Sequence, residues 1–282
     1  MLVEIAIGDA YGSGFEYADS NLPKNDLSKY VKHPTHKLKA GQYTDDTQMS
    51  IAVAELLVDE APFDEDVVIA KFIDVFKRDP RDGYSRGFQA ILERISTVSG
   101  FKQEVVPDSD KSGAAMRAGP IGTLPDAFKV IVAARQQAKI THNTIDGIAA
   151  AQAVALMTHY FLYDKGPKAG IGQYLTLAGT RNWDEPWTGK VKAQGWMDVR
   201  AAVTCIKATD NLADCLKMVV DFGGDTDTAA AITMAAASCS REMKKNLPQH
   251  LYDTLEKGKY GLRFLRELDE KLMAKMKQGG NS

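Results

Sequence analysis

Two acidic clusters, Thr44–Thr47 and Gly223–Thr228, carry the side chains best suited to chemistry. Each combines two aspartates with threonines and stands directly before an apolar segment. One aspartate at a helix N-terminus is ordinary, because its carboxylate accepts unpaired backbone N–H groups and suits the helix dipole. Capping explains two aspartates in each cluster less well. If the two clusters meet, their four carboxylates would repel one another unless a cation lay between them.

Oxygen ligands of this type are typical of magnesium or manganese sites and unlike the cysteine and histidine ligands of zinc. Four carboxylates can hold two ions that share ligands, an arrangement found in hydrolytic centres. The Gly223–Gly224 pair would let the backbone approach a ligand closely. The residues therefore predict a centre for Mg²⁺ or Mn²⁺ ions around Asp45, Asp46, Asp225 and Asp227.

Three other classes of enzyme do not match these spacings. Isoprenyl-type synthases carry a third aspartate three positions beyond an acidic pair, whereas Asp46 is followed by threonine, glutamine and methionine. Phosphohydrolases with a His-Asp motif need the two residues side by side, and His142 is followed by Asn143. No local motif supports a serine or cysteine nucleophile.

The elements that must position these residues read as helices along nearly the whole chain. Apolar residues between 49 and 57 recur at helical intervals and predict a helix that begins just after Asp46. Alternating stretches bounded by hairpin turns are nearly absent. We therefore predict one all-α domain over residues 1–282. Further helices are predicted at 67–76, 127–138, 145–161, 212–220, 228–237 and 262–276, and loops at 113–125, 166–172 and 182–195, where glycine and proline cluster.

Composition excludes several classes of function. The chain has 282 residues and a formal net charge of −2, so it lacks the basic excess that a nucleic-acid backbone attracts. It contains neither an 18-residue apolar run nor, at residues 1–7, the basic leader of an export signal. Its three cysteines lack metal-ligand spacing and suit a reducing compartment. We expect a cytoplasmic monomer with no nucleic-acid or membrane partner.

Four segments, taken in order, resemble the ADP-ribosylglycohydrolase family. They are Gly8–Gly12 with the later Glu16, Tyr43–Met49, Gly113–Arg117 and Gly223–Thr228. The resemblance extends from about residue 5 to about residue 240. It implies an all-α orthogonal helical bundle with a centre of two Mg²⁺ or Mn²⁺ ions.

The resemblance also implies roles for residues at this centre. The first acidic cluster would hold one ion and the second cluster the other, with Asp227 shared between them. Glu16 falls where family members keep a glutamate beside the metals, and Asp9 is expected to be a buried residue that orients the first helix. The expected catalytic residues are Glu16, Asp45, Asp46 and Asp227. The expected metal ligands are Thr44, Asp45, Asp46, Asp225, Asp227 and Thr228.

A diphosphate substrate needs hydrogen-bond donors rather than acids. The segment Ser109–Gly113 offers backbone N–H groups, hydroxyls and a lysine before an expected helix start, which suits an anion. The resemblance adds a histidine near the diphosphate and a tyrosine in the cleft, while Arg117 is expected to be structural. One of the three tryptophans is a candidate to stack on adenine, with packing as the alternative. The expected substrate-binding residues are Ser109, Lys111, Ser112, Gly113, His142 and Tyr84.

The predicted activity is hydrolysis of the bond between ADP-ribose and an acceptor side chain, first of all arginine on an ADP-ribosylated protein. Carboxylates would stabilise the oxocarbenium-like transition state of such a reaction. Serine acceptors, free ADP-ribosyl compounds and modified nucleic acid stay open. The alternatives are an inactive ADP-ribose-binding or structural homologue and a metal-dependent nucleotide phosphohydrolase. The full acidic set favours an enzyme over a binding protein.

Overall fold

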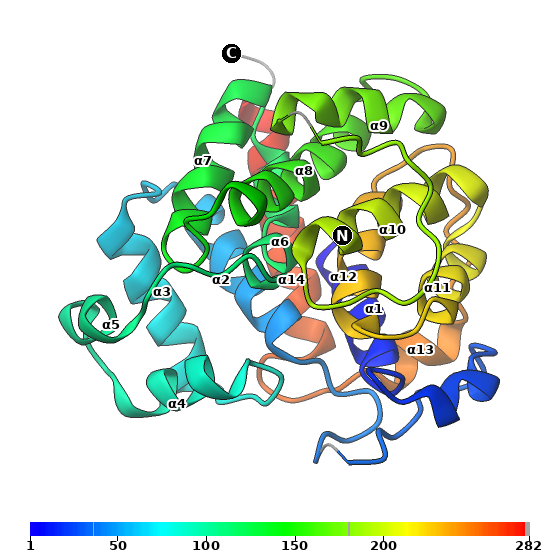
Figure 1. Cartoon of the computed structure of the whole chain (residues 1–282), viewed down its shortest axis with the longest axis horizontal. Coiled ribbons are helices and arrows are strands. Elements are labelled where there is room, and N and C mark those ends of the chain that lie inside the picture. The colour runs from blue at the N-terminus through cyan, green and yellow to red at the C-terminus, as the bar shows by residue number, and fades with distance from the viewer. Residues whose placement is uncertain (36, 180, 280–282) are drawn as a thin grey trace.

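The computed structural model describes residues 1–35, 37–179 and 181–279 (Figure 1). Within these ranges helices are joined by loops and no residue lies in a β-strand, which confirms the all-α fold class. The α-helices are α1 (Leu2–Gly12), α2 (Asp45–Val58), α3 (Glu65–Arg78), α4 (Arg86–Arg94), α5 (Val98–Glu104), α6 (Gly113–Met116), α7 (Ala127–Lys139), α8 (Ile145–Leu162), α9 (Ile171–Tyr174), α10 (Gly195–Ala208), α11 (Leu212–Asp221), α12 (Thr226–Ala237), α13 (Gln249–Thr254) and α14 (Leu262–Gly279). The 3-10 helices are η1 (Asp19–Lys24), η2 (Gly119–Thr123), η3 (Lys168–Gly170) and η4 (Leu175–Ala178).

Two segments expected to be loops contain helices instead. Residues 113–125 hold α6 and η2, and residues 166–172 hold η3 and the start of α9. The glycines of the first segment serve close packing rather than a turn: a Cβ on Gly122 would lie 2.6 Å from the carbonyl oxygen of Ala155. Helix α1 was missed for a different reason, since all its residues except Glu4 are buried and it shows no amphipathic period.

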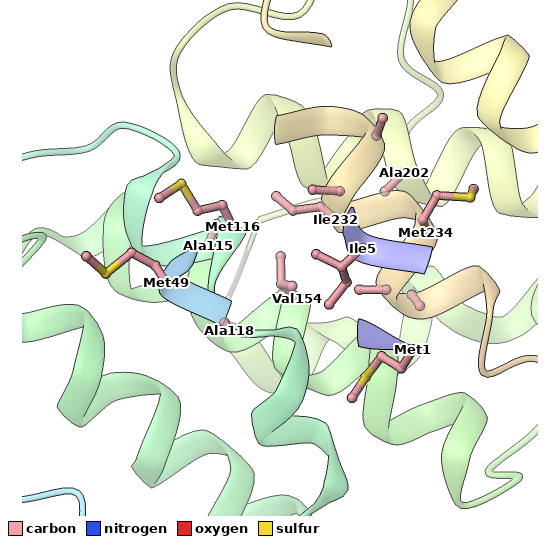
Figure 2. Close-up of a cluster of buried hydrophobic side chains, with 14 of the residues drawn as sticks. Met1, Ile5, Met49, Ala115, Met116, Ala118, Val154, Ala202, Ile232 and Met234 are labelled. Carbon is pink, nitrogen blue, oxygen red and sulfur yellow. The ribbon is translucent and has the colours of Figure 1, made fainter. Parts of the chain in front are cut away.

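Helices α1 and α12 pack against each other at the centre of the bundle (Figure 1). Every residue of α12 and every residue of α1 except Glu4 is buried, so protein surrounds both helices on nearly all sides. The backbones approach closely because α1 carries Gly8 and Gly12 at the contact, where added Cβ atoms would lie 2.6 Å and 2.3 Å from carbonyl oxygens of α12. Figure 2 shows Ile5 of α1 and Ile232 of α12 in one apolar cluster with Val154 of α8.

Helix α8 forms the second central element of the core. It is long and apolar enough to cross a membrane by length and composition alone, yet 78% of it is buried inside the protein. It packs against α7, α10, α6 and η2. Its apolar character therefore serves the protein core.

The α1–α12 contact makes Gly12 sensitive to substitution. Gly12→Ala would place Cβ 2.3 Å from the carbonyl oxygen of Thr226 and 2.6 Å from Cα of Asp227. We expect a loss of about 1–3 kcal/mol in the free energy of unfolding, because either backbone must shift. Gly87→Ala is the control, since its Cβ meets nothing within 4 Å in α4 and should add about 0.5–1 kcal/mol. Denaturant unfolding measures both, and a Gly12 variant as stable as wild type would contradict the close helix contact.

Candidate active site

The segments that carry the acidic and donor residues meet around one cavity of about 360 Å³. One side is acidic, one offers hydrogen-bond donors and one is apolar. The acidic side consists of Glu16, Asp45, Asp46, Asp225, Asp227 and Thr228. The donor side includes Ser109, Lys111, Ser112, Gly113, Arg117 and His142. The apolar side includes Tyr84, Phe88, Ile91, Val105 and Val106.

Asp9 holds the first acidic cluster in place. Its Oδ1 accepts hydrogen bonds from the hydroxyl (2.8 Å) and the N–H (3.0 Å) of Thr44, and its Oδ2 accepts from the hydroxyl (2.6 Å) and the N–H (3.0 Å) of Thr47. Asp9 is therefore the buried residue that we expected, but the element that its hydrogen bonds fix is the N-terminus of α2. The Thr44 hydroxyl also lies 3.1 Å from Oδ2 of Asp46, and we assign its single proton to the closer Asp9, which leaves a lone pair of the Thr44 oxygen for a cation.

Helix capping does not account for the aspartates. At α2 the hydroxyl of Thr44 accepts the capping bond from the N–H of Asp46, at 3.4 Å. At α12 Asp225 occupies the N-cap position but its side chain makes no capping hydrogen bond. Asp227 accepts the N–H of the adjoining Thr228, at 3.0 Å. The carboxylates therefore face the cavity, and capping of the helix N-termini is not their main role.

The Gly223–Gly224 turn sets the position of the second cluster. Both glycines have positive φ (67° and 88°), and a Cβ on Gly224 would lie 1.8 Å from the carbonyl oxygen of Val191. The Val191 backbone accepts from the N–H of Asp225 and donates to Gly223, both at 3.1 Å. The close approach that requires glycine is therefore to Val191. The Gly224 carbonyl also accepts from the N–H of Tyr17, at 2.7 Å, which ties the Glu16 loop to the same turn.

The acidic residues fit a hard divalent cation. Oxygens of Glu16, Asp225 and Asp227 lie within 4.8 Å of one another. Oδ1 of Asp46 is buried without a hydrogen-bond partner. Burial and the Asp227 carboxylate raise the pKa of Asp45 and Asp46 far above the usual range, and burial with Asp227 and Asp225 raises the pKa of Glu16 to about 10. A cation would relieve this repulsion and satisfy the open carboxylate oxygen.

Asp198 is an acidic neighbour that no sequence motif indicated. It lies in the first turns of α10, is fully buried and has no hydrogen-bond partner on either carboxylate oxygen. Burial, followed by the charges of Asp225 and Asp227, raises its pKa well above the usual range. Gly83 was also missed: its φ is 123°, and a Cβ there would lie 2.1 Å from Oδ1 of Asp45. Asp198 belongs to no motif, and the contact of Gly83 joins residues far apart in the chain, so only the spatial positions reveal these two roles.

On the donor side, His142 presents a neutral ring to the cavity. Burial, with Arg117 and Lys111 nearby, lowers its pKa to about 3. Arg117 donates to the hydroxyl of Thr141 (2.8 Å), which lies 2.7 Å from Nδ1 of His142. We assign the Thr141 proton to that hydrogen bond, which leaves the histidine proton on Nε2. Arg117 thus has the structural role that we expected, and it also orients His142.

Among the remaining residues expected to bind substrate, some polar groups already hydrogen-bond to the protein and others are open to a ligand. Ser112 is engaged: its N–H donates to Ala193 (2.8 Å) and its hydroxyl to Oδ2 of Asp225 (3.4 Å). The Tyr84 hydroxyl donates to Gln48 (2.6 Å), so this residue offers its ring to the cavity. In the part of the chain that the structure describes, the N–H of Gly113 has no protein acceptor.

The tryptophans do not border the cavity. Trp183 is fully buried, as the packing alternative predicts. Trp187 and Trp196 pack edge to face, with ring centroids 5.6 Å apart. An aromatic surface for a base would therefore come from the apolar side of the cavity.

A family model described as ADP-ribosylglycohydrolase matches residues 1–281. The chain belongs to the ADP-ribosylglycohydrolase family. It is 28% identical over 242 residues to the ADP-ribosyl-[dinitrogen reductase] glycohydrolase of Rhodospirillum rubrum, a match that covers 81% of this chain and 80% of that protein. It is 21% identical over 252 residues to an ADP-ribosylarginine hydrolase of Serratia proteamaculans, covering 82% and 68%.

Solved structures agree on the fold. The chain matches a structure titled ADP-ribosylglycohydrolase-related protein complex with a TM-score of 0.71 and 18% identity, over 99% of this chain and 96% of that chain. Family membership establishes the chain as a hydrolytic enzyme that acts on ADP-ribosyl groups. The acidic cavity gives this ADP-ribosylglycohydrolase a place for the metal that the family uses.

The crowded carboxylates predict how stability depends on pH without metal. The pKa of Asp9 is raised to about 7 and that of Glu16 to about 10, chiefly by burial. In the unfolded chain these carboxyl groups lose their protons at about pH 4. Above that pH the folded state therefore binds more protons than the unfolded state, and the free energy of unfolding falls as pH rises. Metal-free protein should therefore melt at a higher temperature at about pH 5.5 than at about pH 8.5. Mg²⁺ should reduce the difference.

Thermal unfolding with chelator and with Mg²⁺ at both pH values measures this effect. Sodium chloride at matched ionic strength is the control for charge screening. Equal melting temperatures of the metal-free protein at both pH values would contradict the predicted repulsion. Stabilisation by sodium chloride as large as that by Mg²⁺ would contradict a specific cation site.

Proposed function

We propose that this enzyme is a metal-dependent hydrolase that releases ADP-ribose from arginine side chains of modified proteins. The observation that carries the proposal is the cavity itself, in which buried carboxylates, neutral donors and an apolar wall lie together. These three surfaces suit, in turn, a cation with a sugar, a diphosphate and a purine base. The Serratia proteamaculans relative, named an ADP-ribosylarginine hydrolase, supports arginine as the acceptor.

Two Mg²⁺ or Mn²⁺ ions, when bound, would supply the positive charge that holds oxygen atoms of the ribose and offsets the carboxylate repulsion. The proposed ligands come from both helix N-termini, with Asp227 shared between the ions. Thr44 is suited to this role because Asp9 takes its hydroxyl proton. The ligands are Thr44, Asp45, Asp46, Asp225, Asp227 and Thr228.

Glu16 is the proposed proton-transfer group. In hydrolysis the bond from the anomeric carbon to the acceptor nitrogen breaks, and its electron pair leaves with the nitrogen. The oxygen of water bonds to the same carbon, and the proton released from that water moves to the Glu16 carboxylate. Glu16 then gives this proton to the departing guanidine nitrogen, which restores the carboxylate and releases a guanidinium. The carboxylates of Asp45, Asp46 and Asp227 stabilise the positive charge that develops on the sugar.

The donor side would bind the diphosphate. Nε2–H of His142 and the N–H of Gly113 lie close together, since a Cβ on Gly113 would be 3.2 Å from that nitrogen. Ser109 and Lys111 border the same part of the cavity and add a hydroxyl and a positive charge. Adenine would then rest on the apolar side, against Phe88 and Val106.

A panel of linkages tests the reaction and its acceptor. Arginine-, serine- and cysteine-linked ADP-ribosyl peptides are incubated with the protein and Mg²⁺ or Mn²⁺, and products are identified by mass spectrometry. We expect free ADP-ribose, released fastest from the arginine peptide, and no release in excess chelator. Faster release of ADP-ribose from the serine peptide would indicate that serine, and not arginine, is the acceptor. Phosphate or AMP as product would indicate a nucleotide phosphohydrolase, and binding without any product an inactive homologue.

Asp227→Asn separates a metal ligand from a structural carboxylate. The amide keeps the shape and can accept the Thr228 N–H, so the metal-free variant should be as stable as wild type or more stable, because repulsion is relieved. Mg²⁺ should no longer raise its melting temperature, and ADP-ribose release should fall by at least about 100-fold.

Asp126→Asn is the matched control. Asp126 caps α7 by accepting from the N–H groups of Phe128 and Lys129, and it does not border the cavity. Its variant should keep both the Mg²⁺-induced stabilisation and the turnover. If Asp227→Asn behaved in the same way, Asp227 would not be a metal ligand.

A further inference from the structure

Tyr17 is a large aromatic residue that stands exposed at the edge of the active-site cavity. It follows Glu16 directly, borders the cavity and keeps 59% of its surface exposed. Its backbone lies in the left-handed region, with φ at 45°, which bulky side chains rarely adopt. Strain of this kind persists only where the surrounding structure enforces it, and it concentrates at functional sites.

The backbone of Tyr17 is held firmly while its ring is left open. The N–H of Tyr17 donates to Gly224 (2.7 Å), and Ala18 donates to the carbonyl of the fully buried Phe15 (2.9 Å). Within residues 1–35, 37–179 and 181–279, the Tyr17 ring packs on no aromatic or cationic side chain and its hydroxyl has no hydrogen-bond partner. The folded protein therefore gains little from an aromatic ring at this position.

The surroundings of the ring favour a cationic, planar group. Glu16, which directly precedes Tyr17, lies in one acidic group with Asp225 and Asp227, and its carboxylate is the one of these three that is not assigned to a metal ion. A guanidinium is attracted to such charge, and it also stacks on aromatic faces. A serine acceptor offers neither the charge nor the planar surface.

We infer that the Tyr17 ring packs against the guanidinium of the acceptor arginine and selects this acceptor over neutral ones. The inference rests on the proposed hydrolase function and assigns contact with the acceptor side chain to one residue at the edge of the cavity. The Gly224 carbonyl sets the distance of the ring from the acidic cluster, because the same turn carries Asp225. Tyr17 is thus a specificity residue, and Glu16 beside it remains the proton-transfer group.

The test compares Tyr17→Phe, Tyr17→Leu and Tyr17→Ala on arginine- and serine-linked ADP-ribosyl peptides with Mg²⁺. The measured quantity is the ratio of kcat/KM for the arginine peptide to kcat/KM for the serine peptide. Phenylalanine keeps the ring, so its ratio should stay within about twofold of wild type, whereas leucine and alanine should lower the ratio by about fivefold to tenfold. The change should appear mainly in KM for the arginine peptide, because the contact forms on binding.

Phe128→Leu is the matched control, since Phe128 is 72% exposed on α7 and does not border the cavity. Its ratio should equal that of wild type. Mg²⁺-induced stabilisation of every variant verifies that the acidic site is intact. An unchanged ratio in Tyr17→Leu, or a wild type that prefers the serine peptide, would overturn the role of Tyr17 and leave the hydrolase function standing. A wild type that releases ADP-ribose from neither peptide would overturn both.

Discussion

Repulsion among buried carboxylates is the constraint on which this structure depends. The N-termini of α2 and α12 bring Asp45, Asp46, Asp225 and Asp227 to one cavity, and Glu16 joins them from the loop after α1. The dipoles of α2 and α12 favour negative charge at the N-terminus of each helix, but the carboxylates at these two N-termini also repel one another. The rest of the fold holds this arrangement in place until a cation can offset it.

Close helix contacts and hydrogen bonds fix the positions of the two acidic clusters. Gly12 lets α1 lie directly on the start of α12, and Asp9, one turn earlier in α1, accepts hydrogen bonds from four donor groups at the N-terminus of α2. One short helix therefore positions both acidic clusters. The turn at Gly223–Gly224 then connects the second cluster to Val191 and to the Glu16 loop. These links combine backbone hydrogen bonds with the bonds of the fully buried Asp9 carboxylate, so the fold sets the distance between the two clusters.

The donor side of the cavity is joined to the acidic side where the hydroxyl of Ser112 donates to Asp225. Within the donor side, Arg117 orients His142 through Thr141. Burial of these groups lowers the pKa of Arg117 to about 9 and keeps His142 neutral. A neutral imidazole can donate a hydrogen bond to a phosphate oxygen without adding a positive charge beside the metal centre. The active site thus combines carboxylates on one side with hydrogen-bond donors on the other, among which His142 is neutral and Lys111 is cationic.

The amino-acid sequence by itself determined the helical class, both acidic clusters and the family, because amphipathic spacing and compact motifs such as Gly223–Thr228 are local signals. It could not reveal α1 as a fully buried helix, the true partner of Asp9, or the orphaned carboxylate of Asp198. These features join residues that are far apart in the chain or lack a motif. Only the tertiary structure decided them, since burial and mutual repulsion depend on distances that local sequence patterns do not encode.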